Sequence, residues 1–268
     1  MRVWRSLASR EHGDHRPQVP SVSIYTRLLD AVFPLACVVC TCPIRGAAAR
    51  DGPLCHVCRA AAMAPPPPLC IRCGVPLRGR DSFTGSQSCG ACQLRPPAFA
   101  AARGAALYEP GRAPTALVTA LHAFKYRGVR SLAEPLALLI AERLPVPPDV
   151  VLVPVPLHPT RLRERRYNQS ALLARAIAVR TGRPLLLDAL VRRVATPPQA
   201  GLDAAERWAP RLREAFDVPH PSALANRRVL LIDDVITTSA TADACARALL
   251  SAGACRVDVY ALGRTPPA

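Results

Sequence analysis

Two adjacent carboxylates, Asp233 and Asp234, follow the apolar run 229–232 and precede a stretch of small and hydroxyl residues, 237–241. Loop amides and the start of the helix expected after this stretch offer N–H donors and a positive dipole end to a phosphate. The carboxylates can accept hydrogen bonds from the hydroxyls of a ribose. The pattern therefore predicts a ribose-phosphate site. Its predicted members are Asp233, Asp234, Thr237, Thr238, Ser239, Ala240 and Thr241.

A second candidate anion site follows the proline-rich run 153–157. A strand that ends in a rigid proline turn leads into a basic loop with Arg165 and Arg166, and then into a helix start at Asn168 and Gln169. Arginine can hold phosphate oxygens through two parallel hydrogen bonds, so Arg165 and Arg166 are candidate ligands of such a group. The alternative is a solvated helix entrance with no ligand.

Lys125 is the only lysine among the 35 basic residues of the chain. A lysine retained where arginine is otherwise used suggests that a compact point charge is required at this position. We therefore treat Lys125 as a candidate catalytic residue, with chance as the alternative.

Eight of the eleven cysteines form four Cys-x-x-Cys pairs. Two such pairs supply the four thiolates of a tetrahedral zinc site, so the spacing predicts two structural zinc ions. Sequential and crossed combinations of the pairs both remain open, and Cys42 or His56 could replace a ligand of the first site. A redox role would explain one pair but not four. The predicted ligands are Cys37, Cys40, Cys55, Cys58, Cys70, Cys73, Cys89 and Cys92.

The chain carries a formal net charge of +16, which favours polyanionic partners such as nucleic acid or phosphorylated metabolites. A composition that uses arginine freely would give the same charge. Aromatic residues make up only 4% of the chain, which counts against nucleic-acid binding by stacking alone. Tyr126, Tyr167 and Trp208 are the few candidates for stacking.

The elements that must position these residues alternate between strand and helix after residue 97. Apolar strands are expected at 150–153, 228–232 and 256–262, and helices at 115–124, 131–143, 170–180 and 241–252. Such alternation predicts an α/β fold with a parallel sheet and flanking helices. It follows a small cysteine-rich module that is too irregular to fold on an apolar core alone.

We expect three parts in the chain: a flexible extension at 1–27, the zinc-binding module at 28–97 and the α/β domain at 98–268. The apolar stretches are too short to span a bilayer, and the first residues lack the apolar region of a secretory signal. We therefore expect a cytoplasmic protein without membrane insertion.

The segment 229–241 resembles the PRPP-binding motif of type I phosphoribosyltransferases, where PRPP is phosphoribosyl pyrophosphate. Together with the cysteine pairs, Lys125 in the run 124–128, the proline turn and the run 166–169, it identifies the chain as similar to the ComF family. The resemblance implies a type I phosphoribosyltransferase-like sheet. It also implies PRPP bound with Mg²⁺, with Arg165, Arg166 and Lys125 stabilising charge on the pyrophosphate.

The resemblance further implies that Gln199 and Arg207 belong to the flexible loop near the pyrophosphate, together with Asn168 and Gln169. One position departs from the family pattern, because Ser239 stands where the family carries glycine. If that position requires a positive φ angle, serine weakens the loop.

Two functions follow from the resemblance. The first is a phosphoribosyltransferase-like protein that binds PRPP, a ribose phosphate or a nucleotide in DNA uptake during natural transformation. Its expected partners are single-stranded DNA and proteins of the uptake machinery. The alternative is an active phosphoribosyltransferase of nucleotide or base metabolism with an unknown acceptor.

Overall fold

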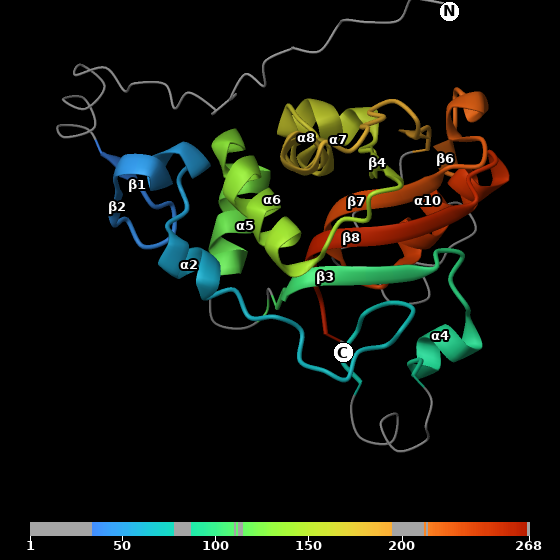
Figure 1. Ribbon diagram of the computed structural model, residues 1–268, viewed down its shortest axis with the longest axis horizontal. Helices are drawn as coiled ribbons and strands as arrows, with labels where there is room; N and C mark the ends of the chain where they lie inside the picture. The colour runs from blue at the N-terminus through green and yellow to red at the C-terminus, as the bar shows by residue number, and fades with distance from the viewer. Residues whose placement is uncertain are drawn as a thin grey trace, which may run out of the picture. The chain divides into compact units, whose positions relative to one another are not determined.

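The computed structural model describes residues 34–77, 87–109, 111, 115–194, 212 and 214–266. The extension expected at 1–27 lies outside the described residues, and so do Gln199 and Arg207. The described residues from Leu35 onward belong to one unit, which holds a sheet, its helices and two cysteine-rich ribbons (Figure 1). The boundary expected at residue 97 remains a prediction.

Four parallel strands form the central sheet. Their order across the sheet is β3 (Ala101–Leu107), β8 (Arg256–Arg264), β7 (Arg228–Ile236) and β4 (Val150–Pro154). Strands covered on both faces are apolar nearly throughout, and every residue of β4 is buried. The predicted α/β class, with a parallel sheet after a cysteine-rich segment, is confirmed.

Helices cover both faces of this sheet (Figure 1). One face packs against α5 (Ala116–Tyr126), α6 (Ala133–Arg143) and α8 (Gln169–Thr181), and the other against α10 (Ala240–Ser251). The four helices predicted from the sequence are therefore present, each with ends within two residues of the prediction.

Side chains fix where two of these helices begin. Thr115 Oγ1 accepts a hydrogen bond from the Val118 amide at 3.2 Å, which caps α5. Asn168 Oδ1 accepts one from the Ser170 amide at 3.0 Å and caps α8, while its Nδ2 donates to the Val155 carbonyl at 2.9 Å. Asn168 thereby ties the start of α8 to the turn that follows β4.

The smaller elements surround this frame. The cysteine-rich part holds β1 (Leu35–Ala36), β2 (Pro43–Ile44), the short helix η1 (Gly46–Asp51), α2 (His56–Ala60) and α4 (Gly90–Leu94). The rest holds η2 (Arg130–Leu132), α7 (Pro159–Arg165), β5 (Val191–Arg192), β6 (Phe216–Asp217) and η4 (Pro221–Leu224).

Two ribbons carry the cysteines, the first at residues 35–60 and the second at 69–77 with 87–95. The second ribbon lies against the edge strand β3, where the Ala102 amide donates to the Arg72 carbonyl at 2.6 Å. A side chain at Gly74 would meet the Ala102 carbonyl oxygen at 2.4 Å, so glycine is required for this approach. The first ribbon packs through α2 against α5 and α6.

Three features differ from the sequence-based expectations. Strand β3 was not predicted, and the segment expected as a basic loop before Asn168 is the helix α7. Strand β7 continues to Ile236, four residues beyond its predicted end, so Asp233 and Asp234 lie within the strand.

Candidate functional site

The loop between β7 and α10 contains two buried hydroxyl groups. Neither Thr238 Oγ1 nor Ser239 Oγ has a hydrogen-bond partner among the described residues. Buried polar atoms are almost always satisfied, so these hydroxyls call for an acceptor that the described residues do not provide. They lie at the N-terminus of the twelve-residue helix α10, where the helix dipole favours an anion.

Ser239 adopts the left-handed conformation, with φ 68° and ψ 2°. This conformation costs a residue with a Cβ about 1–2 kcal/mol, whereas glycine adopts it freely. Ser239 is also the N-terminal capping residue of α10, yet its side chain makes no capping hydrogen bond. The loop geometry therefore requires the positive φ angle for which glycine would be the better residue.

Replacing this serine should strengthen the loop. We expect Ser239→Gly to raise the free energy of unfolding by less than about 1 kcal/mol, because relief at φ is partly offset by glycine's freedom in the unfolded chain. Affinity for phosphate ligands should fall, because the variant removes the Ser239 hydroxyl. Asn226→Gly is the matched control, since Asn226 has φ 56° at the opposite end of β7. Equal ligand affinity in both variants would show that the Ser239 hydroxyl does not bind the phosphate.

The acidic pair occupies two different environments. Asp233 Oδ1 accepts hydrogen bonds from Ser170 Oγ at 3.1 Å and from the Asp234 amide at 2.8 Å. Burial, followed by the neighbouring charge of Asp234, raises the pKa of Asp233 to about 7. Asp233 thus titrates near neutral pH, where a ligand can shift its protonation.

Asp234 forms an ion pair with the single lysine of the chain. Lys125 Nζ, at the end of α5, lies 3.0 Å from Asp234 Oδ2, and both side chains are largely buried. Burial lowers the pKa of Lys125, but the charge and hydrogen bond of Asp234, together with Tyr108 and Asp233, raise it above its ordinary value. The structure therefore brings the predicted Lys125 to the acidic pair.

The two predicted arginines contact aromatic and backbone groups instead. Arg165 Cζ lies 5.3 Å from the centre of the Tyr126 ring, and its Nη1 donates to Gln169 Oε1 at 3.4 Å. Arg166 ends α7 in the left-handed conformation, with φ 64°, and its carbonyl accepts from Arg130 at 3.4 Å. The structure does not bring either guanidinium into contact with the loop 237–241.

Sequence reasoning missed two further arginines, Arg192 and Arg264. Burial lowers the pKa of Arg192, whose Cζ lies 5.4 Å from the centre of the Phe216 ring. Arg264 is buried; its guanidinium donates to the Ile236 and Cys73 carbonyls, both at 3.0 Å, and also to the Thr237 carbonyl. Arg264 thus joins the loop to the second ribbon.

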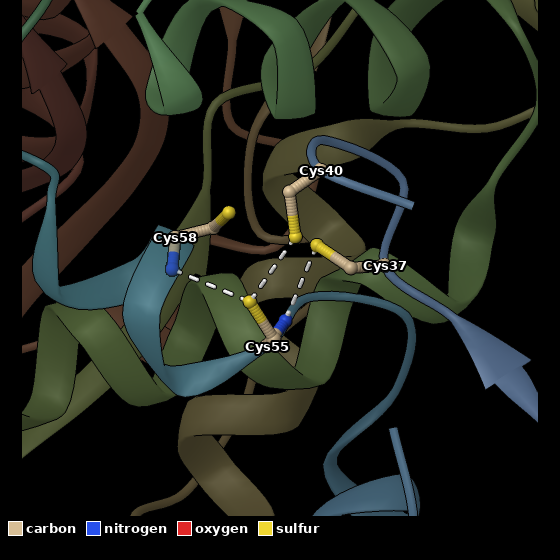
Figure 2. A group of neighbouring side chains, drawn as sticks. All are labelled: Cys37, Cys40, Cys55 and Cys58. Atoms are coloured by element: carbon tan, nitrogen blue, oxygen red, sulfur yellow. Dashed lines mark hydrogen bonds between the residues drawn. The ribbon is translucent and has the colours of Figure 1, made fainter. Parts of the chain in front are cut away.

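The first ribbon gathers four cysteines around one point. Figure 2 shows the sulfurs of Cys37, Cys40, Cys55 and Cys58 directed toward one another, and all lie within 4.8 Å. The Cys40 and Cys55 sulfurs are 3.7 Å apart, close to the roughly 3.8 Å edge of a tetrahedron with Zn–S bonds of about 2.3 Å. The donor set therefore fits a structural zinc ion.

Backbone amides support the charged thiolate form in this cluster. The Cys55 amide donates to Cys37 Sγ at 3.5 Å, and the Cys58 amide to Cys55 Sγ at 3.4 Å. Burial raises the pKa of Cys37, but the amides of Cys40 and Cys55 outweigh this and lower it to about 6. Such thiolates are the form that binds zinc.

The second cluster has the same form, with Cys70, Cys73, Cys89 and Cys92 within 4.8 Å of one another. The sulfurs of Cys73 and Cys89 are 3.6 Å apart, and the neighbouring thiols lower the pKa of Cys70. Of the two pairings left open by the sequence, the sequential one is therefore found. Cys42 and His56 are exposed and belong to neither cluster.

Comparison with known proteins agrees with these features. Residues 28–93 match the model of the double zinc ribbon domain. The chain is 31% identical over 241 residues to DNA utilization protein YhgH of Salmonella typhi, which covers 87% of this chain and 98% of that protein. It is 29% identical to competence protein F of Haemophilus influenzae, over 74% of this chain and 85% of that protein.

Among solved structures, a glutamine PRPP amidotransferase from B. subtilis matches with a TM-score of 0.34 and 24% identity. The match covers 49% of this chain and 26% of that chain. Within the described residues, every helix is too short or too polar to cross a membrane.

Proposed function

Because this chain belongs to the ComF family, we propose that it is a phosphoribosyltransferase-like protein of DNA uptake that binds PRPP, another ribose phosphate or a nucleotide. The observation that carries the proposal is the pair of buried hydroxyls, Thr238 and Ser239, without partners at the start of α10. They lie in the loop that follows β7, and the acidic pair lies near the end of that strand, so a phosphate and the hydroxyls of its ribose would be bound side by side.

Each part of the site has a role in this proposal. The hydroxyls and amides of 237–241 hold the phosphate, and Asp233 and Asp234 accept hydrogen bonds from the ribose hydroxyls. Mg²⁺ would neutralise charge on the pyrophosphate of PRPP when bound. Lys125 positions Asp234 through their ion pair, and Ser170 orients Asp233.

The proposal is limited to binding and does not include transfer, because of the contacts that the two predicted arginines make. Arg165 is engaged with Tyr126 and Gln169, and the Arg166 carbonyl with Arg130. Transfer of phosphoribose to an acceptor with help from Arg165 would require that side chain to turn toward the pyrophosphate.

The test is equilibrium binding of PRPP to the zinc-loaded protein, with and without Mg²⁺, between pH 6 and 8. Hydrogen bonding to ribose hydroxyls requires ionised Asp233, whose pKa in the free protein is raised to about 7. Below that pH the site must lose a proton to bind, so affinity should rise about tenfold from pH 6 to 8. Absence of PRPP binding at every pH, in folded protein, would show that the proposed ligand is wrong.

A single substitution separates the titration of the protein from that of the ligand. Ser170 donates a hydrogen bond that favours the charged form of Asp233, so Ser170→Ala should move the midpoint to higher pH. Ionisation of the PRPP phosphates would give the same midpoint in both proteins. An unmoved midpoint would assign the pH dependence to the ligand.

A further inference from the structure

One aromatic side chain is exposed among the described residues. Tyr126, the last residue of α5, has 65% of its surface accessible, whereas Tyr167 is buried and its hydroxyl donates to the Phe124 carbonyl. An aromatic ring left in water on a protein with so few aromatic residues is available for contact with a flat ligand.

The Tyr126 ring is held in place from two sides. The Arg165 guanidinium lies 5.3 Å from its centre, and the His122 ring meets it at 5.4 Å with an interplanar angle of 70°. Arg165 is itself bonded to Gln169, which is almost fully buried. A ring fixed in this way loses little conformational freedom when a second flat group stacks on it.

The charge around the ring is strongly positive. The segments 122–130 and 159–166 carry seven cationic side chains and one carboxylate, that of Glu164. A second arginine–aromatic contact joins Arg130 of the first segment to Tyr167, the residue after the second, with Arg130 Cζ 4.9 Å from the centre of the Tyr167 ring. The seven cations are Lys125, Arg127, Arg130, Arg161, Arg163, Arg165 and Arg166.

The ring is next in sequence to a residue of the proposed ribose-phosphate site. Tyr126 follows Lys125 directly, and the Lys125 ammonium reaches the acidic pair at 3.0 Å from Asp234. Arg165 lies on α7, whose neighbour α8 begins with the residue next to Ser170. Tyr126 and Arg165 are thus each close in sequence to residues that contact the acidic pair.

We propose that Tyr126, backed by Arg165, stacks an unpaired base of single-stranded DNA whose phosphates contact the arginines of α7. An exposed ring with arginines beside it combines the two elements that bind single strands without sequence preference: stacking and backbone charge. Duplex DNA offers no free base face, so only the unpaired strand can use the ring. The choice of DNA rests on the proposed function, whereas the residues rest on the geometry.

The experiment measures fluorescence anisotropy of a labelled oligothymidylate at several salt concentrations. Stacking on one side chain is lost on substitution by alanine, so Tyr126→Ala should bind about tenfold more weakly or worse, whereas Tyr126→Phe should bind nearly as wild type. Val179→Ala, which shortens another exposed apolar side chain on α8, is the control and should bind unchanged. Equal affinity of Tyr126→Ala and wild type would overturn the proposal.

Two further measurements separate stacking from charge. Arg163→Gln should reduce the slope of log affinity against log salt concentration by about one, whereas Tyr126→Ala should leave that slope unchanged. An oligonucleotide without bases should bind wild type and Tyr126→Ala equally. If Tyr126→Ala binds this probe more weakly than wild type does, the ring does not stack bases and the proposal is overturned.

The failures of the two proposals can be told apart in the same proteins. PRPP binding should be the same in Tyr126→Ala and wild type, because the exposed ring makes no contact with the loop 237–241. If Tyr126→Ala and wild type bind oligothymidylate equally and both bind PRPP, only the stacking site is overturned. Absence of PRPP binding with a Tyr126-dependent DNA affinity would overturn only the ribose-phosphate assignment.

Discussion

Cys70→Ser combined with Cys73→Ser is expected to lower the zinc content from two ions per chain to one and to weaken PRPP binding. Structural zinc supplies folding free energy directly, so removal of two ligands should unfold the second ribbon. The Cys73 carbonyl accepts from Arg264, which also holds the Ile236 and Thr237 carbonyls. Loss of the ribbon therefore frees the guanidinium that supports the phosphate loop. Metal analysis and PRPP titration of the same preparation check both effects.

The first ribbon provides the matched comparison. Cys37→Ser with Cys40→Ser should also remove one zinc ion, but this cluster packs through α2 against α5 and α6 and lacks a contact with the loop among the described residues. PRPP affinity should therefore fall much less. Cys42→Ser, outside both clusters, should retain two ions. An equal loss of PRPP affinity from the two ribbon variants would contradict a specific link through Arg264.

Asp233→Asn with Asp234→Asn is expected to weaken PRPP binding at least about a hundredfold, because hydrogen bonds to charged groups contribute about 1.5–3 kcal/mol each. Folding should survive. Asp233 has a pKa of about 7, so its asparagine resembles a form already populated at neutral pH. Asp234→Asn leaves Lys125 buried without its partner, which should cost about 3 kcal/mol of stability.

Two controls make this result specific. Asp188→Asn removes one exposed carboxylate and should leave PRPP affinity unchanged. Adding Lys125→Met to Asp234→Asn removes the unpaired ammonium, so stability should recover while PRPP binding does not. Unchanged PRPP affinity in the double asparagine variant would show that the acidic pair does not bind the ribose.

The buried strands and amphipathic helices could be predicted because their patterns are local. Every residue of β4 is apolar and buried, and the helices α5 and α8 are preceded by Thr115 and Asn168, residue types that cap helices. The eight cysteines were predictable from spacing alone. Their sequential pairing was not, because spacing does not say which pairs meet in space.

Other parts depend on contacts between distant segments. Strand β3 is composed mostly of Ala, Gly and Arg, and only its pairing with β8 makes it a strand. The helix α7 was not predicted, because its arginines were interpreted as part of a basic loop. The partner of Lys125 lies 109 residues away, so no local pattern indicates the ion pair with Asp234. The backbone of Ser239 is likewise set by the tight passage from β7 into α10.

The buried guanidinium of Arg264 leaves an imbalance of charge beneath the phosphate loop. Its hydrogen-bond partners among the described residues are all carbonyl oxygens, which orient dipoles toward the cation but bring no counter-charge. A buried cation is costly unless an anion compensates it. The phosphate proposed for the loop would supply that anion and so complete the electroneutrality of this part of the core. The folded protein should accordingly be more resistant to heat when phosphate ligands are present, by an amount that grows with their concentration.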